Sequence, residues 1–180
     1  MYSETLKLIV TRAQRRPASC LPRELNPWFS QLAHTQYSEA AETAEDKIWR
    51  LWMHYPQTRA AQDLERATRA IAAFDFPAAE GILNTLLARH PDYAEAWNKR
   101  ATLYFIQMRD EESLQALHRT LQLEPRHFGA VCGFAEICLS HEYQDHALFA
   151  FEAALALNPH LDGIRARVNE LLTLLPERAH

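Results

Sequence analysis

The chain has 180 residues, with 19 Lys and Arg against 23 Asp and Glu, so its formal net charge is −4. This length suits one domain, and 48% hydrophobic with 23% charged residues is ordinary for a globular protein. The composition excludes a disordered chain, and the acidic balance argues against a nucleic-acid partner. Only 4 Gly occur, which disfavours folds rich in tight turns and predicts an all-α fold.

Residues 1–24 form a basic N-terminal region, predicted to be a short amphipathic helix followed by a connector. The apolar face of the helix is formed by Leu6, Ile9, Val10 and Ala13, and its other faces carry Lys7, Arg12, Arg15 and Arg16. Pro17 and Pro22 predict that the connector is stiff. Such a helix can lie on an anionic membrane or on RNA. Because its apolar face lacks Trp and Phe, we expect it instead to dock on the first repeat described below.

The N-terminal region also indicates the cellular compartment of the protein. Its arginines interrupt the apolar run that a secretory signal needs, and no stretch approaches 18 consecutive apolar residues. Cys20, Cys132 and Cys138 form no C-x-x-C pair, which favours reduced thiols. We therefore expect a cytoplasmic protein with no membrane span.

Residues 25–59 are predicted to form a helix pair, for which two interpretations stay open. Pro56 lies 35 residues before Pro91, so the pair fits a degenerate copy of the repeat that follows. The alternative is a non-repeat pair that covers the apolar end of the repeat array. In both cases Trp49 and Trp52 supply a large apolar surface to bury.

A 34-residue spacing of prolines reveals the repeat, because Pro91, Pro125 and Pro159 each follow an apolar helical run. With proline at position 32, the units are 60–93, 94–127 and 128–161. Positions 8 and 20 hold a small residue in every unit, and position 24 holds a large apolar residue. These residues are Ala67, Ala101 and Ala135, then Ala79, Ser113 and Ala147, then Leu83, Leu117 and Phe151.

This pattern resembles the tetratricopeptide repeat (TPR) family, and the resemblance implies a right-handed solenoid of antiparallel helix pairs. Two segments, AWNKRAT at 96–102 and PRHFGA at 125–130, resemble a signature of small bacterial TPR proteins. Most of those have no assigned function, and some are exported. The family usually has Gly near position 15, where this chain has Phe74, Met108 and Glu142. That departure leaves the geometry of the turn between the two helices open.

Residues 162–180 are predicted to form a helix that caps the solenoid and ends at Pro176. Its apolar residues recur at helical spacing, and polar residues between them face solvent.

The nine histidines prompt a search for reactive sites. His141 and His146 are five residues apart, whereas a zinc-binding H-E-x-x-H helix needs four so that both face the same way. His127 is expected to pack and to cap a loop. No catalytic signature is found, so we predict no catalytic residue, no cofactor and no metal.

The resemblance implies that the first helices of successive units line a concave binding face. The predicted partner-binding residues are Phe29, Leu64, Thr68, Asn98, Thr102, Phe105, Glu136 and Leu139. Family members that clamp a terminal carboxylate need Lys at position 5 and Asn at position 9. Here those places hold Leu64 and Thr68, so that mode is excluded. A competing interpretation is that Leu64, Ile71 and Leu139 are covered by neighbouring helices.

The predicted function is non-catalytic binding of a protein or peptide in this apolar groove, as an adaptor or assembly scaffold. One alternative is a secretion-type chaperone dedicated to one client. A second alternative is an enzyme that uses a groove histidine. The identity of the partner and the oligomeric state stay open.

Overall fold

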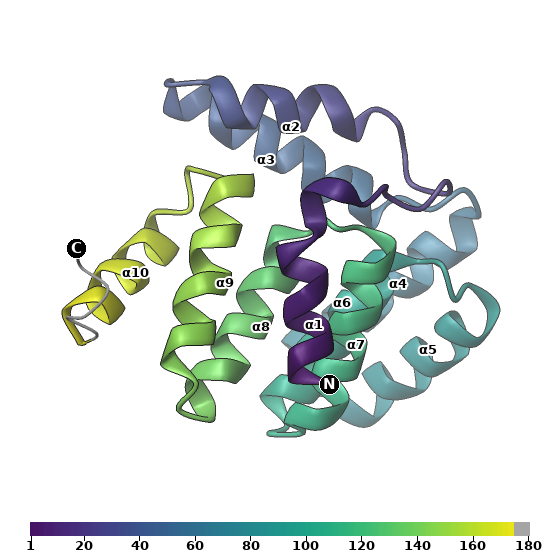
Figure 1. Cartoon of the computed structure of the whole chain (residues 1–180). Helices are drawn as coiled ribbons and strands as arrows, with labels where there is room; N and C mark the ends of the chain where they lie inside the picture. The colour runs from purple at the N-terminus through teal and green to yellow at the C-terminus, as the bar shows by residue number, and fades with distance from the viewer. Residues whose placement is uncertain (175–180) are drawn as a thin grey trace.

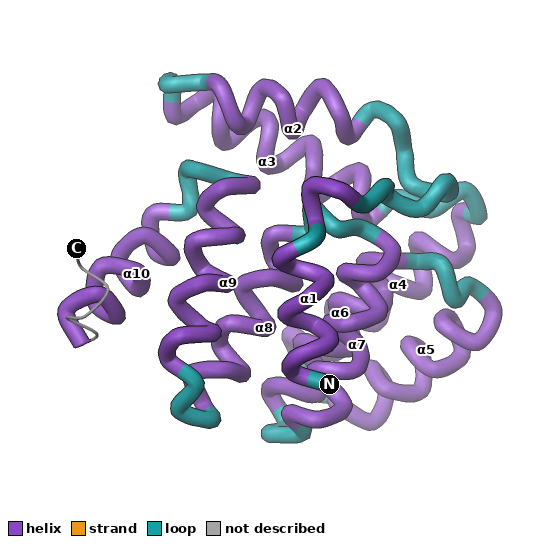
Figure 2. Tube along the Cα trace, in the orientation of Figure 1, coloured by secondary structure: helices purple, strands orange, loops and turns teal. Residues whose placement is uncertain are grey.

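The computed structural model describes residues 1–174, and this part of the chain consists of helices and loops without a strand (Figures 1 and 2). The all-α prediction is confirmed. In chain order the helices are α1 (Tyr2–Val10), the short 3-10 helix η1 (Arg12–Gln14), α2 (Leu25–His34), α3 (Ser38–Met53), α4 (Thr58–Ala72), α5 (Phe76–Arg89), α6 (Ala94–Ile106), α7 (Asp110–Leu123), α8 (Phe128–Ser140), α9 (Gln144–Leu157) and α10 (Asp162–Leu174).

Three consecutive helix pairs, α4–α5, α6–α7 and α8–α9, form the body of the molecule. The small residues predicted for the crossing of each pair are buried. In the middle pair the hydroxyl of Ser113 donates to the backbone carbonyl of Ala101 at 2.9 Å. A large side chain at either position would hold the helices apart, because their backbones approach closely at this crossing.

The turn within each pair adopts the left-handed conformation without glycine. Phe74, Met108 and Glu142 have φ of 59°, 60° and 63°. All three turns therefore share one backbone conformation, and each places a residue with a Cβ where glycine would be less strained.

The α2–α3 pair lies across one end of the later helices (Figure 1). Helix α3 contacts α4 and α6, and α2 contacts α9. The core of the α2–α3 pair is buried together with Phe128 of α8, and it includes Leu25, Leu32, Ile48 and Trp52. The apolar residues of this pair are thus buried mainly against each other, and Phe128 of the third unit completes their cluster.

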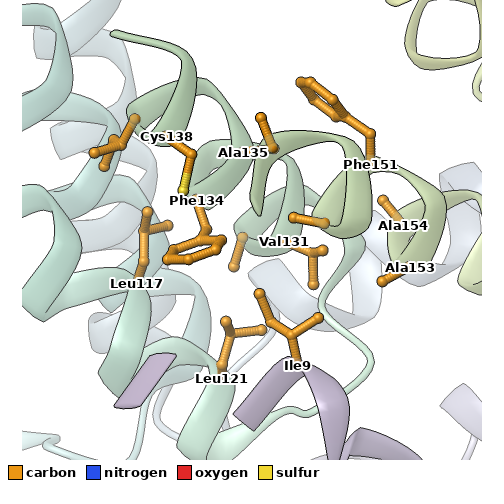
Figure 3. Close-up of a cluster of buried hydrophobic side chains, with 14 of the residues drawn as sticks. Ile9, Leu117, Leu121, Val131, Phe134, Ala135, Cys138, Phe151, Ala153 and Ala154 are labelled. Carbon is orange, nitrogen blue, oxygen red and sulfur yellow. The ribbon is translucent and has the colours of Figure 1, made fainter. Parts of the chain in front are cut away.

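Helix α1 packs on α7 and α9, where Ile9 is buried in a cluster that includes Leu121 and Val131 (Figure 3). The expected docking on the first repeat is wrong. Arg15 donates to the backbone carbonyl of Leu121 at 2.9 Å, near the end of α7 where carbonyls lack helical partners. The physical reason is that α7 and α9 present both an apolar stripe and these free acceptors.

Helix α10 packs on α9 through the buried residues Val168 and Leu171. The predicted end of this helix at Pro176 lies outside the described residues. Within residues 1–174, no helix combines the length and the apolarity needed to cross a membrane.

Candidate functional site

A hollow of about 80 Å³ lies between α6, α7 and α8, on the side predicted to form the concave face. One water occupies about 10–15 Å³ by this kind of measure, so a branched aliphatic side chain would fit. We call it the groove hollow. Its walls include residues of three helices, namely Asn98, Thr102, Phe105, Leu117, Gly129 and Gly133.

Three predicted site residues meet on one face of α6 at this hollow. Asn98 is 7% exposed, whereas the side chain of Phe105 is 37% exposed at the rim. The Thr102 hydroxyl donates to the backbone carbonyl of Asn98 at 3.2 Å. This bond holds the Thr102 side chain against its own helix. The hollow therefore has an apolar rim and a polar wall.

The predicted residues on the flanking helices are only partly open. Leu139 on α8 is half-buried. Glu136 forms an ion pair with Arg167 of α10 at 3.0 Å, so its carboxylate is already engaged. Thr68 on α4 is half-buried, and its hydroxyl donates to the Leu64 carbonyl at 2.9 Å.

Two predicted site residues do not line the open face. Leu64 is fully buried in the core that α4 shares with its neighbours, as the competing interpretation expected. Phe29 is buried within the α2–α3 core, where it contacts Phe128 and lies beneath the guanidinium of Arg126. Neither side chain can contact a partner while these packings persist.

Part of the concave face is filled by helix α3, which the sequence pattern did not indicate. A Cβ on Gly129 would come within 2.7 Å of Cη2 of Trp49. The ammonium of Lys99 lies 5.7 Å from the centre of the same indole ring, within reach of a cation–π interaction. Trp49 of α3 therefore covers the start of α8 at Gly129 and the part of α6 at Lys99.

A buried polar cluster supports this junction. His127 Nε2 lies 2.7 Å from the Glu95 carboxylate, and both side chains are 0% exposed. The backbone N–H of Ala130 donates to His127 Nδ1, so Nε2 carries the proton and donates to Glu95. Trp52 stacks on the imidazole at 4.0 Å. The expectation that His127 packs in the core is confirmed, and its side chain caps the start of α8 rather than a loop.

The charge of Glu95 is compensated within the same cluster. Burial alone would raise its pKa, but the hydrogen bond from His127 and the charge of Lys99 at 3.0 Å outweigh this effect. The pKa of Glu95 is therefore held below its ordinary value.

The remaining candidates for chemistry show no assembled reactive site. Burial raises the pKa of both Cys132 and Cys138 to about 12, so these thiols stay protonated and weakly nucleophilic. His141 contacts Asp110 at 3.0 Å. Among the described residues no group of three or more His, Cys, Asp or Glu could hold a metal ion.

Stacked pairs of antiparallel helices with small residues at each crossing define a helical-repeat protein. No family model matches the chain. A TPR repeat-containing protein of Rhizobium etli is 33% identical over 159 residues, which cover 88% of this chain and 78% of that protein. The chain belongs to the tetratricopeptide repeat family. Repeat proteins of this family generally act as protein-interaction modules rather than as enzymes.

Proposed function

We propose that this protein is a non-catalytic adaptor or scaffold that binds a segment of a partner protein at the groove hollow. The observation that carries the proposal is a partly exposed aromatic side chain, Phe105, at the rim of a recess in the concave face. Phe105 and Leu139 would contact the apolar side of the partner segment. Thr102 would supply a polar contact at the hollow and Thr68 one on the neighbouring helix α4, whereas the amide of Asn98 already donates to the buried Glu95 carboxylate at 3.3 Å.

The size and lining of the hollow support an apolar ligand side chain. Aromatic and aliphatic anchors that enter a recess dominate the binding free energy of many interfaces. Helices and extended segments present such anchors at regular spacing. The hollow would take one anchor, and Phe105 would cover its flank.

Two alternatives compete with a general adaptor. A chaperone dedicated to one client would use the same groove, and it would be distinguished by co-purification with a single protein. An enzyme would need a reactive group at the groove. The described residues that line the hollow include no histidine, cysteine or carboxylate. We propose a cytoplasmic location because the three cysteines are unpaired.

The test replaces Phe105 at the rim and Leu139 on the neighbouring helix α8 in one variant, Phe105→Ser with Leu139→Ser. Phe74→Ser is the matched control, because Phe74 is a 72% exposed aromatic on the turn between α4 and α5. We expect unchanged helicity by circular dichroism for both. Proteins captured by the wild type and the control should be lost from the double variant, since an anchor contributes about 2 kcal/mol or more.

Two results would contradict the proposal. Unfolding of the double variant would show that Phe105 and Leu139 belong to the core. An intact fold with unchanged capture would show that the partner binds elsewhere.

A further inference from the structure

A second concave site lies at the edge formed by the turns within the helix pairs. It is a cleft of about 430 Å³, and three segments far apart in the sequence converge on it. They are the start of α1, the α6–α7 turn with the start of α7, and the α8–α9 turn. We call it the turn-edge cleft. Its lining includes Tyr2, Met108, Asp110, Glu111, His141 and Tyr143.

Aromatic rings form one side of the cleft. Tyr2 meets Tyr143 edge-on, with ring centres 5.3 Å apart and planes at 68°. Tyr2 meets His141 similarly at 5.8 Å and 75°. Tyr143 is 49% exposed, so it can offer a ring face to a ligand. Ring faces carry partial negative charge and attract cations.

Carboxylates form the other side, and their charge is not fully compensated. The one arginine in the lining, Arg109, is already paired with Glu80 at 3.1 Å and with Glu112 at 3.0 Å. Asp110 Oδ2 accepts a hydrogen bond from the Ser140 hydroxyl at 3.2 Å and lies 3.0 Å from Nε2 of His141, but no lysine or arginine among the described residues forms an ion pair with it. Its Oδ1 is buried, and among the described residues it has no hydrogen-bond partner. Asp110 and Glu111 thus leave negative charge beside the rings.

Tyr2 in the lining of the cleft is affected by burial first and by the neighbouring carboxylates second. Burial raises the pKa of Tyr2 to about 12, and the nearby carboxylates of Asp110 and Glu111 add to the increase. A phenol surrounded by carboxylates resists ionisation because a further negative charge would be repelled.

Acidic residues at the start of a helix also stabilise its dipole, and this accounts for carboxylates on the first turn of α7. It does not account for the rings from α1 and the α8–α9 turn. The helix dipole also does not account for Met108. This residue is 82% exposed, and its positive φ of 60° would favour glycine. The Met108 side chain contributes little to the core and is free to cover an apolar ligand group.

We propose that the turn-edge cleft binds an arginine side chain carried by a segment of a partner protein. The guanidinium would stack on Tyr143 and face the carboxylates of Asp110 and Glu111. An apolar neighbour in the same segment would lie on Met108. Guanidinium suits this site because it is planar, is always charged and stacks on aromatic rings. The negative lining repels phosphate groups, so a nucleic acid or an anionic membrane is not the expected ligand.

The proposal is independent of the groove hollow and is tested on the full chain with a defined probe. The probe is acetyl-Ala-Leu-Arg-Leu-Ala-amide, and its matched control carries citrulline, which has the shape of arginine without the charge. Binding is followed by NMR titration of backbone amides at low salt. We expect saturable shifts at Met108, Asp110 and Tyr143, and about tenfold weaker binding of the citrulline peptide.

Variants locate the binding. Tyr143→Ala and Asp110→Asn should each weaken binding of the arginine peptide several-fold, because one removes a ring face and the other a charge. Tyr37→Ala and Glu39→Gln remove an exposed ring and an exposed charge near the start of α3, and they should leave binding unchanged. The groove variant Phe105→Ser should also leave it unchanged, which separates this proposal from the groove function.

Three results would overturn the inference. One is equal binding of the citrulline peptide. Another is a shift pattern spread over the acidic surface without focus on the cleft. The third is undiminished binding by the Tyr143→Ala variant, whose exposed turn position permits the change without loss of the fold.

Discussion

Replacing Glu142 by glycine should stabilise the protein, although it removes a side chain. Glu142 has φ of 63° in the turn between α8 and α9, and it is exposed. A residue with a Cβ pays about 1–2 kcal/mol in the left-handed region, which glycine does not. Glycine also raises the conformational entropy of the unfolded chain, and this lowers the free energy of unfolding by about 0.4–1 kcal/mol. The net gain over alanine at this position is therefore about 0.5–1 kcal/mol.

The comparison that isolates the backbone effect is Glu142→Gly against Glu142→Ala, since both remove the same charge. For a chain of this size, the expected difference corresponds to about 1–4 °C in melting temperature. Combining it with Phe74→Gly and Met108→Gly, which share the conformation, should give about 1.5–3 kcal/mol if the three separate turns contribute additively. Thermal unfolding followed by circular dichroism measures each difference.

A control with the opposite sign comes from Gly81, which lies within α5. It is exposed, and an added Cβ would meet no atom within 4 Å. Gly81→Ala should therefore stabilise the protein by about 0.5–1 kcal/mol, because alanine favours a helix interior. The reasoning fails if the alanine variant at position 142 is as stable as the glycine variant.

Two further predictions concern the junction of α3 with α8. Gly129→Ala should destabilise the protein by about 1–3 kcal/mol in urea unfolding, because the new Cβ would clash with Trp49; no loss would show that the indole yields. Burial raises the pKa of Glu95, but His127 and a lysine lower it below 4.5. Its ionised form thus stabilises the fold above the unfolded pKa, and this contribution is lost as the pH falls from about 4.5 through the lower folded pKa. Glu95→Gln should flatten the acid dependence of stability, and an unchanged slope between pH 5 and pH 3 would contradict this role.

The sequence by itself determined the repeat architecture, because the signals for it are local. Each proline at position 32 follows the second helix of its pair by two residues, where the chain must leave the helix. The small residues at positions 8 and 20 are buried where predicted, since close helix crossings admit little else. The family and the all-α fold follow from these regularities.

The identity of the groove residues was only partly accessible in this way. Repeat position correctly placed Asn98, Thr102 and Phe105 on one face of α6. It could not distinguish the exposed Phe105 from the fully buried Leu64, because exposure depends on which neighbouring helices cover each position. Likewise, the lack of glycine at position 15 left the turn open, and the structure shows that all three turns adopt the left-handed conformation.

Only the tertiary structure decided how the segments outside the three pairs pack. Helix α1 binds α7 and α9, and α3 fills part of the groove through Trp49. The turn-edge cleft joins Tyr2 to Tyr143, which are separated by most of the chain. Such contacts leave no periodic signal in the sequence. They depend on the shape and the free hydrogen-bonding groups that the assembled repeats present, and these exist only once the helices have packed.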